Sequence, residues 1–172
     1  HAIRALALPA RLAHMVLTAR ERGQGARAAD LAVLLTERGL GGNDIDLDVR
    51  LSRFQRERGE RATRARGLAK RLAGRDVVQG TEPGSVGRLL IDAYPDRIAK
   101  ARGNGQFTLA NGRGGEMDAA TSLARAPWLV VADLAGRAGK ARILAAAETT
   151  EADIREALGD RIVSGRQVSY DA

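Results

Sequence analysis

Two glycine-rich segments contain the residue types from which phosphate sites are built. The first, Gly136-Arg-Ala-Gly139-Lys140, has the glycine-lysine pair of a P-loop. A P-loop also requires a glycine five residues before the glycine of that pair and a serine or threonine after the lysine. Leu134 and Ala141 stand at those two positions. The segment therefore lacks the backbone cradle and the magnesium ligand, and it predicts a hairpin turn rather than a nucleotide site.

The second segment, Asn111-Gly112-Arg113-Gly114-Gly115, permits two interpretations. Its bare backbone amides and the Arg113 guanidinium are suited to hold a phosphate group. Its asparagine-glycine pair is also typical of a flexible turn. We favour the turn and keep Arg113 as a candidate contact to nucleic acid.

Catalysis and metal binding have little support in the sequence. The chain has no cysteine, which excludes disulfides, thiol catalysis and cysteine-bound zinc. Its two histidines are His1 and His14, and no His-Glu-x-x-His pattern surrounds His14. Acidic, histidine and lysine side chains do not recur at a spacing that specifies acid-base catalysis. We therefore expect no catalytic residue, no metal and no cofactor in this chain.

Basic charge is concentrated in the first half of the chain. The 172 residues carry a formal net charge of +7 at pH 7. Residues 1–80 contain 16 basic and 9 acidic residues, whereas residues 81–172 contain 12 of each. Within the first half, residues 50–75 contain ten basic side chains against Glu57 and Glu60. A polyanion would be attracted to this segment.

The first half also has the apolar spacing of helices. Apolar residues recur at i, i+3, i+4 and i+7 from Leu12 to Ala19, and again from Ala28 to Leu35. A third helix is predicted from Asn43 to about residue 72, with a length of roughly 40 Å. At 100° per residue, five arginines of this helix fall in an arc of about 80° beside the apolar stripe. They are Arg50, Arg53, Arg61, Arg64 and Arg71.

These arginines permit two interpretations. We expect Arg50, Arg53, Arg61 and Arg64 to contact the phosphates of a nucleic acid. Alternatively, Glu57 and Glu60 neutralise them by i, i+4 pairing, as on any solvated charged helix. The spacing alone does not decide between the two. A bend is also allowed, because each of the two glycines in the predicted helix weakens it by roughly 1 kcal/mol.

The second half changes to the pattern of short strands. Residues 74–84 have the glycine and proline content of a linker. Ser85 is suited to cap a helix, and Pro95 predicts further helical structure as far as Arg102. Strands are predicted at residues 106–110, 128–134, 141–146, 162–164 and 167–170, with a helix at 151–158. Several short strands with one helix near the end predict a small β-barrel, and the chain as a whole is expected to be α+β.

Composition limits the class of protein. Hydrophobic residues make up 44% of the chain and charged residues 28%, as in ordinary folded domains. No run approaches the roughly 20 apolar residues of a membrane-spanning helix. Arg4, Pro9 and Arg11 interrupt the apolar start of the chain, which argues against a signal peptide. We expect a cytoplasmic protein without membrane contact.

Several segments together resemble one family. Leu6-Ala-Leu-Pro-Ala-Arg-Leu-Ala-His-Met-Val-Leu17, followed by residues 28–38, resembles the helicase-associated helical region of DEAH-type ATP-dependent helicases. Residues 93–99 (Ala-Tyr-Pro-Asp-Arg-Ile-Ala), 109–114 and 128–134 (Trp-Leu-Val-Val-Ala-Asp-Leu) are similar to the bacterial HrpB branch of that family. The segments keep the order and the rough spacing of the family.

The resemblance implies a domain order. A helical ratchet-like domain would occupy residues 1–80, a linker with connecting helices 81–102, and an OB-like barrel 103–172, without its last strand or a later segment. In the family these parts follow two ATPase domains and line the path of single-stranded nucleic acid. No Walker A loop, Asp-Glu-Ala-His box or arginine finger occurs in this chain, so ATP and Mg²⁺ are expected to bind the ATPase domains of a parent protein.

The expected function is therefore accessory: the chain holds single-stranded nucleic acid, expected to be RNA, while absent ATPase domains drive translocation. On the barrel side, Arg97 and Arg113 are the candidate contacts. Two rival interpretations stay open. One is a stand-alone RNA- or ribosome-binding module, and the other is a protein-interaction scaffold whose arginines only solvate it. A P-loop motif encoded upstream of His1 would favour the helicase.

Overall fold

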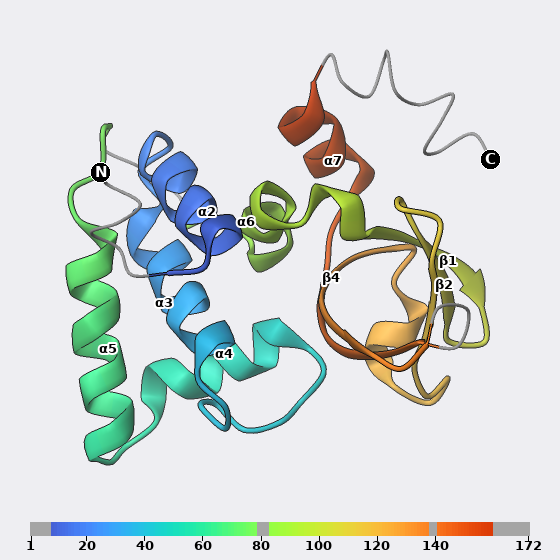
Figure 1. Cartoon of the computed structure of the whole chain (residues 1–172), viewed down its shortest axis with the longest axis horizontal. Coiled ribbons are helices and arrows are strands. Elements are labelled where there is room, and N and C mark those ends of the chain that lie inside the picture. Colours follow the sequence, from blue (N-terminus) through green and yellow to red (C-terminus); the bar gives the residue numbers. More distant parts are fainter. Residues whose placement is uncertain (1–7, 79–82, 138–140, 160–172) are drawn as a thin grey trace.

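The computed structural model of the chain describes residues 8–78, 83–137 and 141–159. Helices form the N-terminal part and a closed β-barrel forms the C-terminal part, with helix α6 (Val86–Ala93) between them (Figure 1). The predicted α+β class and the small barrel in the second half are confirmed.

The first two helices follow the apolar spacing of the sequence. Helix α2 spans Ala10–Arg20 and α3 spans Gly25–Thr36. The stripe from Leu12 to Ala19 is buried at all four predicted positions, and α3 buries most of the corresponding face. Because a helix packs through an apolar stripe of this kind, α2 and α3 contact each other.

The prediction of a single long helix after Asn43 is wrong. The segment forms two helices, α4 (Leu47–Arg56) and α5 (Glu60–Ala73), which meet at a corner (Figure 1). Gly59 lies at this corner with a φ of +112°. A side chain is strained in that conformation, which glycine adopts readily and which ends helical geometry.

The connection to the barrel differs from the prediction in its second half. Ser85 caps α6 as expected, because its hydroxyl accepts a hydrogen bond of 3.1 Å from a backbone N–H of the first turn. Pro95 begins only one 3-10 turn, which ends at Arg97, and strand β1 (Ile98–Gly103) follows. The prediction of helical structure as far as Arg102 is therefore wrong. Pairing of β1 with strands on both sides overrides the local helical signal.

Five strands close into the barrel in the order β1-β2-β3-β5-β4. Strands β3 and β5 are parallel, and the other neighbours are antiparallel. The remaining elements are β2 (Gln106–Leu109), β3 (Gly114–Glu116), a 3-10 helix (Ser122–Arg125), β4 (Trp128–Ala135), β5 (Ala141–Glu148) and α7 (Glu151–Leu158). The strands predicted at 106–110, 128–134 and 141–146 and the helix at 151–158 are confirmed. Those predicted at 162–164 and 167–170 lie outside the described residues.

Strand β4 joins two hydrophobic cores. Leu129 and Val131 belong to the core inside the barrel with Phe107, whereas Val130 and Ala132 belong to the core shared with the helices. Successive residues of a strand point to opposite faces. A strand buried on both faces therefore appears in the sequence as a continuous apolar run, and the barrel packs directly on the helical part.

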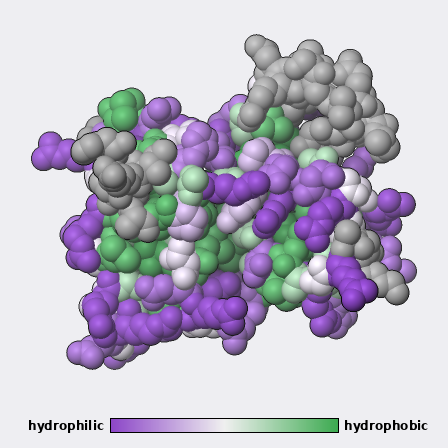
Figure 2. All heavy atoms as spheres, viewed as in Figure 1, coloured by the Kyte–Doolittle hydropathy of each residue, from purple (hydrophilic) through white to green (hydrophobic). Residues whose placement is uncertain are grey.

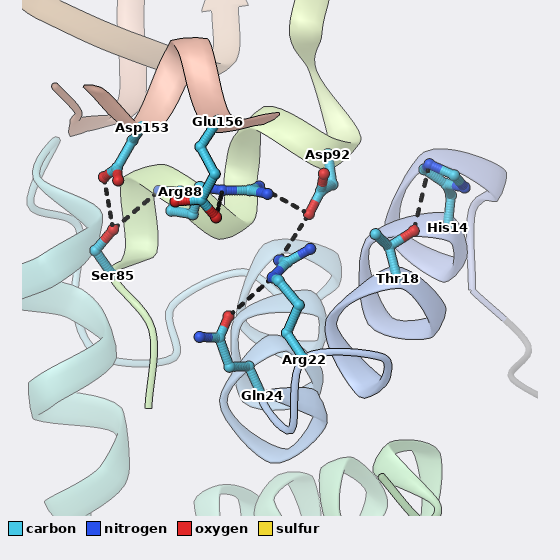
Figure 3. A network of polar contacts seen from close by, with 9 residues as sticks. All are labelled: His14, Thr18, Arg22, Gln24, Ser85, Arg88, Asp92, Asp153 and Glu156. Atoms are coloured by element: carbon cyan, nitrogen blue, oxygen red, sulfur yellow. Dashed lines mark hydrogen bonds and ion pairs between the residues drawn. The ribbon is translucent and has the colours of Figure 1, made fainter. Parts of the chain in front are cut away.

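A network of ion pairs adds a polar connection between α6, α7 and the end of α2 (Figure 3). Oδ2 of Asp92 accepts hydrogen bonds from Arg22 at 2.9 Å and from Arg88 at 3.2 Å. Arg88 also pairs with Glu156 of α7 at 3.4 Å. The side chains of Arg88 and Asp92 are only 11% exposed. Two arginines from different parts of the chain thus share one buried carboxylate.

Candidate nucleic-acid interface

The corner between α4 and α5 carries the four arginines predicted to bind phosphate on the helical side. Because the helix breaks at Gly59, these arginines do not form one arc on one helix. Arg50 and Arg53 lie on α4, whereas Arg61 and Arg64 lie on α5. Figure 2 shows hydrophilic residues gathered over the lower ends of both helices. We call these four residues the arginine cluster.

Arg50 is the least accessible member of the cluster. Its Nη2 donates a hydrogen bond of 3.3 Å to the carbonyl oxygen of Leu40, in the loop before α4. Burial lowers the pKa of Arg50, and the carboxylates of Asp133 and Asp44 act in the opposite direction. Its Nε is shielded from solvent and has no hydrogen-bond partner. Arg50 therefore holds the loop, and its guanidinium is less accessible to a ligand than that of an exposed arginine.

Arg53, Arg61 and Arg64 are exposed. Arg61 donates to the carbonyl oxygen of Arg38 and forms an ion pair of 3.6 Å with Glu37. Arg61 and Arg64 also line a depression of about 450 Å³ on the surface of α5. Guanidinium groups beside an open depression are suited to hold the oxygens of a phosphodiester.

The two glutamates of the alternative interpretation do not neutralise the cluster. Oε1 of Glu57 accepts a hydrogen bond of 2.8 Å from the backbone N–H of Gly41. Among the described residues, no ion pair joins Glu57 or Glu60 to any member of the arginine cluster. The alternative pairing with these glutamates does not form, and within the cluster the one ion pair among the described residues is that of Arg61 with Glu37.

Arg97 connects the two parts of the molecule. Its Nη1 donates a hydrogen bond of 2.9 Å to the carbonyl oxygen of Ala132 in β4. Its guanidinium lies 5.0 Å from the ring centre of Tyr94, over which Arg11 also lies at 5.4 Å. Because its guanidinium already has these contacts, Arg97 has a clear structural role. Its contact with nucleic acid stays a prediction.

Arg113 follows a tight turn, as the favoured interpretation expects. The backbone N–H of Gly112 donates to the carbonyl oxygen of Leu109 at 2.9 Å, and that of Arg113 donates to Oδ1 of Asn111 at 3.0 Å. Strand β3 begins at the next residue. The Nε of Arg113 is shielded from solvent and has no hydrogen-bond partner. A phosphate contact by Arg113 stays a prediction.

The barrel carries a polar depression that the sequence pattern does not reveal. It has a volume of about 260 Å³ and is lined mainly by β2 and β3, with Arg102, Gln106, Thr108 and Glu116 at its edges. Nη1 of Arg102 donates a hydrogen bond of 3.1 Å to the hydroxyl of Thr108. The one feature of the sequence that points to this depression is the apolar Phe107 between two polar residues. Because Phe107 is buried, its neighbours on β2 point outward.

Other kinds of site find no support in the described part of the chain. No group of three or more histidine, cysteine or acidic side chains there is placed to hold a metal ion. No helix there is long and apolar enough to cross a membrane. His14 lies on the exposed surface of α2, with Nε2 3.5 Å from the hydroxyl of Thr18. Gly139 and Lys140 lie outside the described residues.

Comparisons with known proteins agree on one kind of helicase. Over 80 residues, 45% of this chain, the sequence is 40% identical to the ATP-dependent RNA helicase HrpB of Escherichia coli (strain K12). The crystal structure of the E. coli DExH-box NTPase HrpB matches 90% of this chain with a TM-score of 0.72 and 32% identity. That of the E. coli DEAH/RHA helicase HrpB matches 87% with a TM-score of 0.67 and 32% identity. The chain corresponds to a C-terminal region of HrpB-type helicases.

The resemblance inferred from the sequence segments is therefore confirmed. This HrpB-type region spans 19% and 18% of the two solved chains and 9% of the curated relative. No protein-family model matches the chain. The agreement covers both the helices and the barrel, so the arrangement of the two parts is also similar to that of HrpB.

Proposed function

We propose that this chain is an accessory part of an ATP-dependent helicase and holds single-stranded RNA. The observation that carries the proposal is the exposure of Arg53, Arg61 and Arg64, which form no ion pair with Glu57 or Glu60, in a chain that is similar to HrpB over 90% of its length. Phosphates supply most of the affinity of nucleic-acid complexes and are recognised chiefly by arginine and lysine.

The barrel supports an OB-like assignment within this proposal. OB-folds are small five-stranded barrels that bind oligonucleotides across the face of strands 2 and 3. The polar depression of this barrel lies on β2 and β3. We assign the helical part to the ratchet-like domain, with the arginine cluster as its contact to the RNA backbone.

The motor function belongs to the parent protein in this proposal. ATP and Mg²⁺ would bind its ATPase domains, which are the proposed intramolecular partners of this chain. The chain itself would supply backbone contacts that keep the strand in place. Because phosphate contacts carry no base information, the arginine cluster alone would hold RNA of any sequence.

The test is the salt dependence of RNA binding. Fluorescence anisotropy with a labelled single-stranded RNA at several salt concentrations gives the slope of log affinity against log salt. Each phosphate contact on a single strand contributes about −0.7 to this slope. Replacing Arg53, Arg61 and Arg64 by alanine is therefore expected to flatten the slope by about 2.

A matched control removes the same charge elsewhere. Arg75, Arg125 and Arg155 are exposed and lie outside the arginine cluster. Their replacement by alanine changes the net charge equally and is expected to leave the slope nearly unchanged. Equal slopes for wild type and the cluster variant would refute the cluster as a binding surface. No binding of RNA at any salt concentration would refute the proposed function.

A further inference from the structure

A small polar pocket lies apart from the arginine cluster, the barrel depression and the ion-pair network. It has a volume of about 240 Å³ and lies between the start of α3, the end of α4 and Pro83. Its polar lining includes Arg27 and Asp30 from α3 and Gln55 from α4. Pockets for drug-sized ligands have volumes of roughly 300–1,000 Å³. The pocket is therefore of a size for one planar ring system rather than for a whole nucleotide.

The polar groups of this pocket are incompletely satisfied. The Nε of Arg27 is shielded from solvent and has no hydrogen-bond partner. Asp30 accepts one side-chain hydrogen bond, a long one of 3.3 Å from Nε2 of Gln55. Burial raises the pKa of Asp30. Shielded polar groups normally have partners, so the unpartnered Nε of Arg27, beside a carboxylate with one long hydrogen bond, leaves hydrogen-bonding capacity at this pocket for a ligand.

The positions of the two charged side chains define what that ligand offers. Arg27 and Asp30 are three residues apart on α3, so they project from the same face of the helix. They form no ion pair within 4 Å of each other, although the positive charge of Arg27 acts on the Asp30 carboxylate. The pocket thus presents hydrogen-bond donors next to a carboxylate, and a matching ligand has acceptors next to N–H groups.

Guanine is the nucleobase that meets both demands. Its O6 and N7 acceptors are the commonest base partners of arginine. Its N1–H and N2 amino group are two adjacent donors, which the two oxygens of a carboxylate can accept together. Adenine and cytosine each lack the N1–H beside an amino group, and uracil has a single N–H. Proteins recognise unpaired RNA bases through such edges.

We propose that Arg27 and Asp30 form a pocket for one guanine base of the bound single strand, with Arg27 donating to O6 and N7 and Asp30 accepting from N1–H and the N2 amino group. This inference rests on the proposed function, because the base must arrive on a bound strand. Gln55 of the pocket and Arg53 of the arginine cluster lie within one turn of α4. Side chains two residues apart on a helix face different directions, so a strand bound to the cluster has to curve round α4 to place a base in the pocket.

The experiment compares RNA octamers that differ at one base. Anisotropy would give the affinities of an all-uridine octamer, the same octamer with one central guanosine, and versions with inosine or 7-deazaguanosine in its place. Wild type is expected to bind the guanosine octamer about tenfold more tightly than the all-uridine octamer, within the range of one bidentate base contact. Inosine lacks the N2 amino group and 7-deazaguanosine lacks N7, so each is expected to lose part of this preference.

Variants assign the two contacts. Asp30→Asn is expected to reduce the guanosine preference to the part that Arg27 supplies and to narrow the difference between guanosine and inosine. Arg27→Gln is expected to abolish the difference between guanosine and 7-deazaguanosine. Arg64→Ala is the control, since it is expected to weaken both octamers equally and to leave their ratio unchanged. The ratio of two affinities does not depend on the fraction of each variant that is folded.

The outcomes separate this inference from the proposed function. Salt-dependent binding with equal affinity for the uridine and guanosine octamers would overturn the guanine pocket and leave the proposed function intact. Absence of binding to every octamer would overturn both. Binding of free guanosine monophosphate without any preference between the octamers would overturn the assignment to a base on a strand.

Discussion

Replacing Asp92 by asparagine is expected to destabilise the junction between α2, α6 and α7. The substitution keeps the shape of the side chain and removes its negative charge, so Arg22 and Arg88 lose the carboxylate that both contact. Removing one partner of a buried ion pair costs about 3–5 kcal/mol. Here Arg22 is 23% exposed and Arg88 keeps Glu156. We therefore expect a loss of about 2–3 kcal/mol, below the fully buried case.

Thermal and urea unfolding followed by circular dichroism measure this loss. For a chain of this size, 1 kcal/mol shifts Tm by roughly 2–4 °C, so Tm is expected to fall by about 4–12 °C. The matched control is Glu151→Gln, which removes a carboxylate from the exposed Glu151–Arg155 pair, where the two side chains are 62% and 67% exposed. That substitution is expected to cost less than about 1 kcal/mol. Equal stability of Asp92→Asn and the control would refute the reasoning.

Two further predictions concern the helix corner and the pH dependence of stability. Gly59→Ala is expected to destabilise the chain by about 1 kcal/mol because Gly59 has a positive φ, whereas Gly67→Ala inside α5 is expected to stabilise it by about 0.5–1 kcal/mol. Urea unfolding would show changes of opposite sign in the free energy of unfolding. Changes of the same sign would contradict the assigned corner. The hydrogen bond from Arg11 holds the pKa of Asp96 below its ordinary value of 3.8, so this pair stabilises the fold above that pH and the stabilisation is lost as the pH falls below it. Asp96→Asn is accordingly expected to be less stable than wild type at pH 6, by up to about 1 kcal/mol for so exposed a pair. This difference in the free energy of unfolding should narrow below pH 3.8. A difference that is constant with pH would contradict the prediction.

Helices and strands that depend on their own residues were predictable from the sequence. The apolar spacing of α2 describes one buried face, and the structure buries that face. The corner at Gly59 was harder, because the last buried residue of α4, Phe54, and the first of α5, Ala62, are eight residues apart. That separation is close to two helical turns, so two short helices continue the same apolar stripe as one long helix.

Elements that depend on distant partners were not predictable. Strand β3 contains two glycines in three residues, and it exists because β2 and β5 pair with it on either side. The guanine pocket has the same origin, because Gln55 reaches Asp30 only through the packing of α4 against α3. Sequence reasoning therefore identified the charged segment, and the structure was needed to identify which of its side chains share a pocket.

The arginines divide into two kinds that composition does not distinguish. Arg22 and Arg88 have hydrogen bonds that join separate parts of the fold, whereas Arg53 and Arg64 are exposed. Loss of an arginine of the first kind is expected to lower stability, because its buried partner is left unpaired, and to leave the salt dependence of RNA binding unchanged. Loss of one of the second kind is expected to do the reverse. The net charge of +7 is therefore not the charge that a nucleic acid meets, since part of it stabilises the joint between the helices and the barrel.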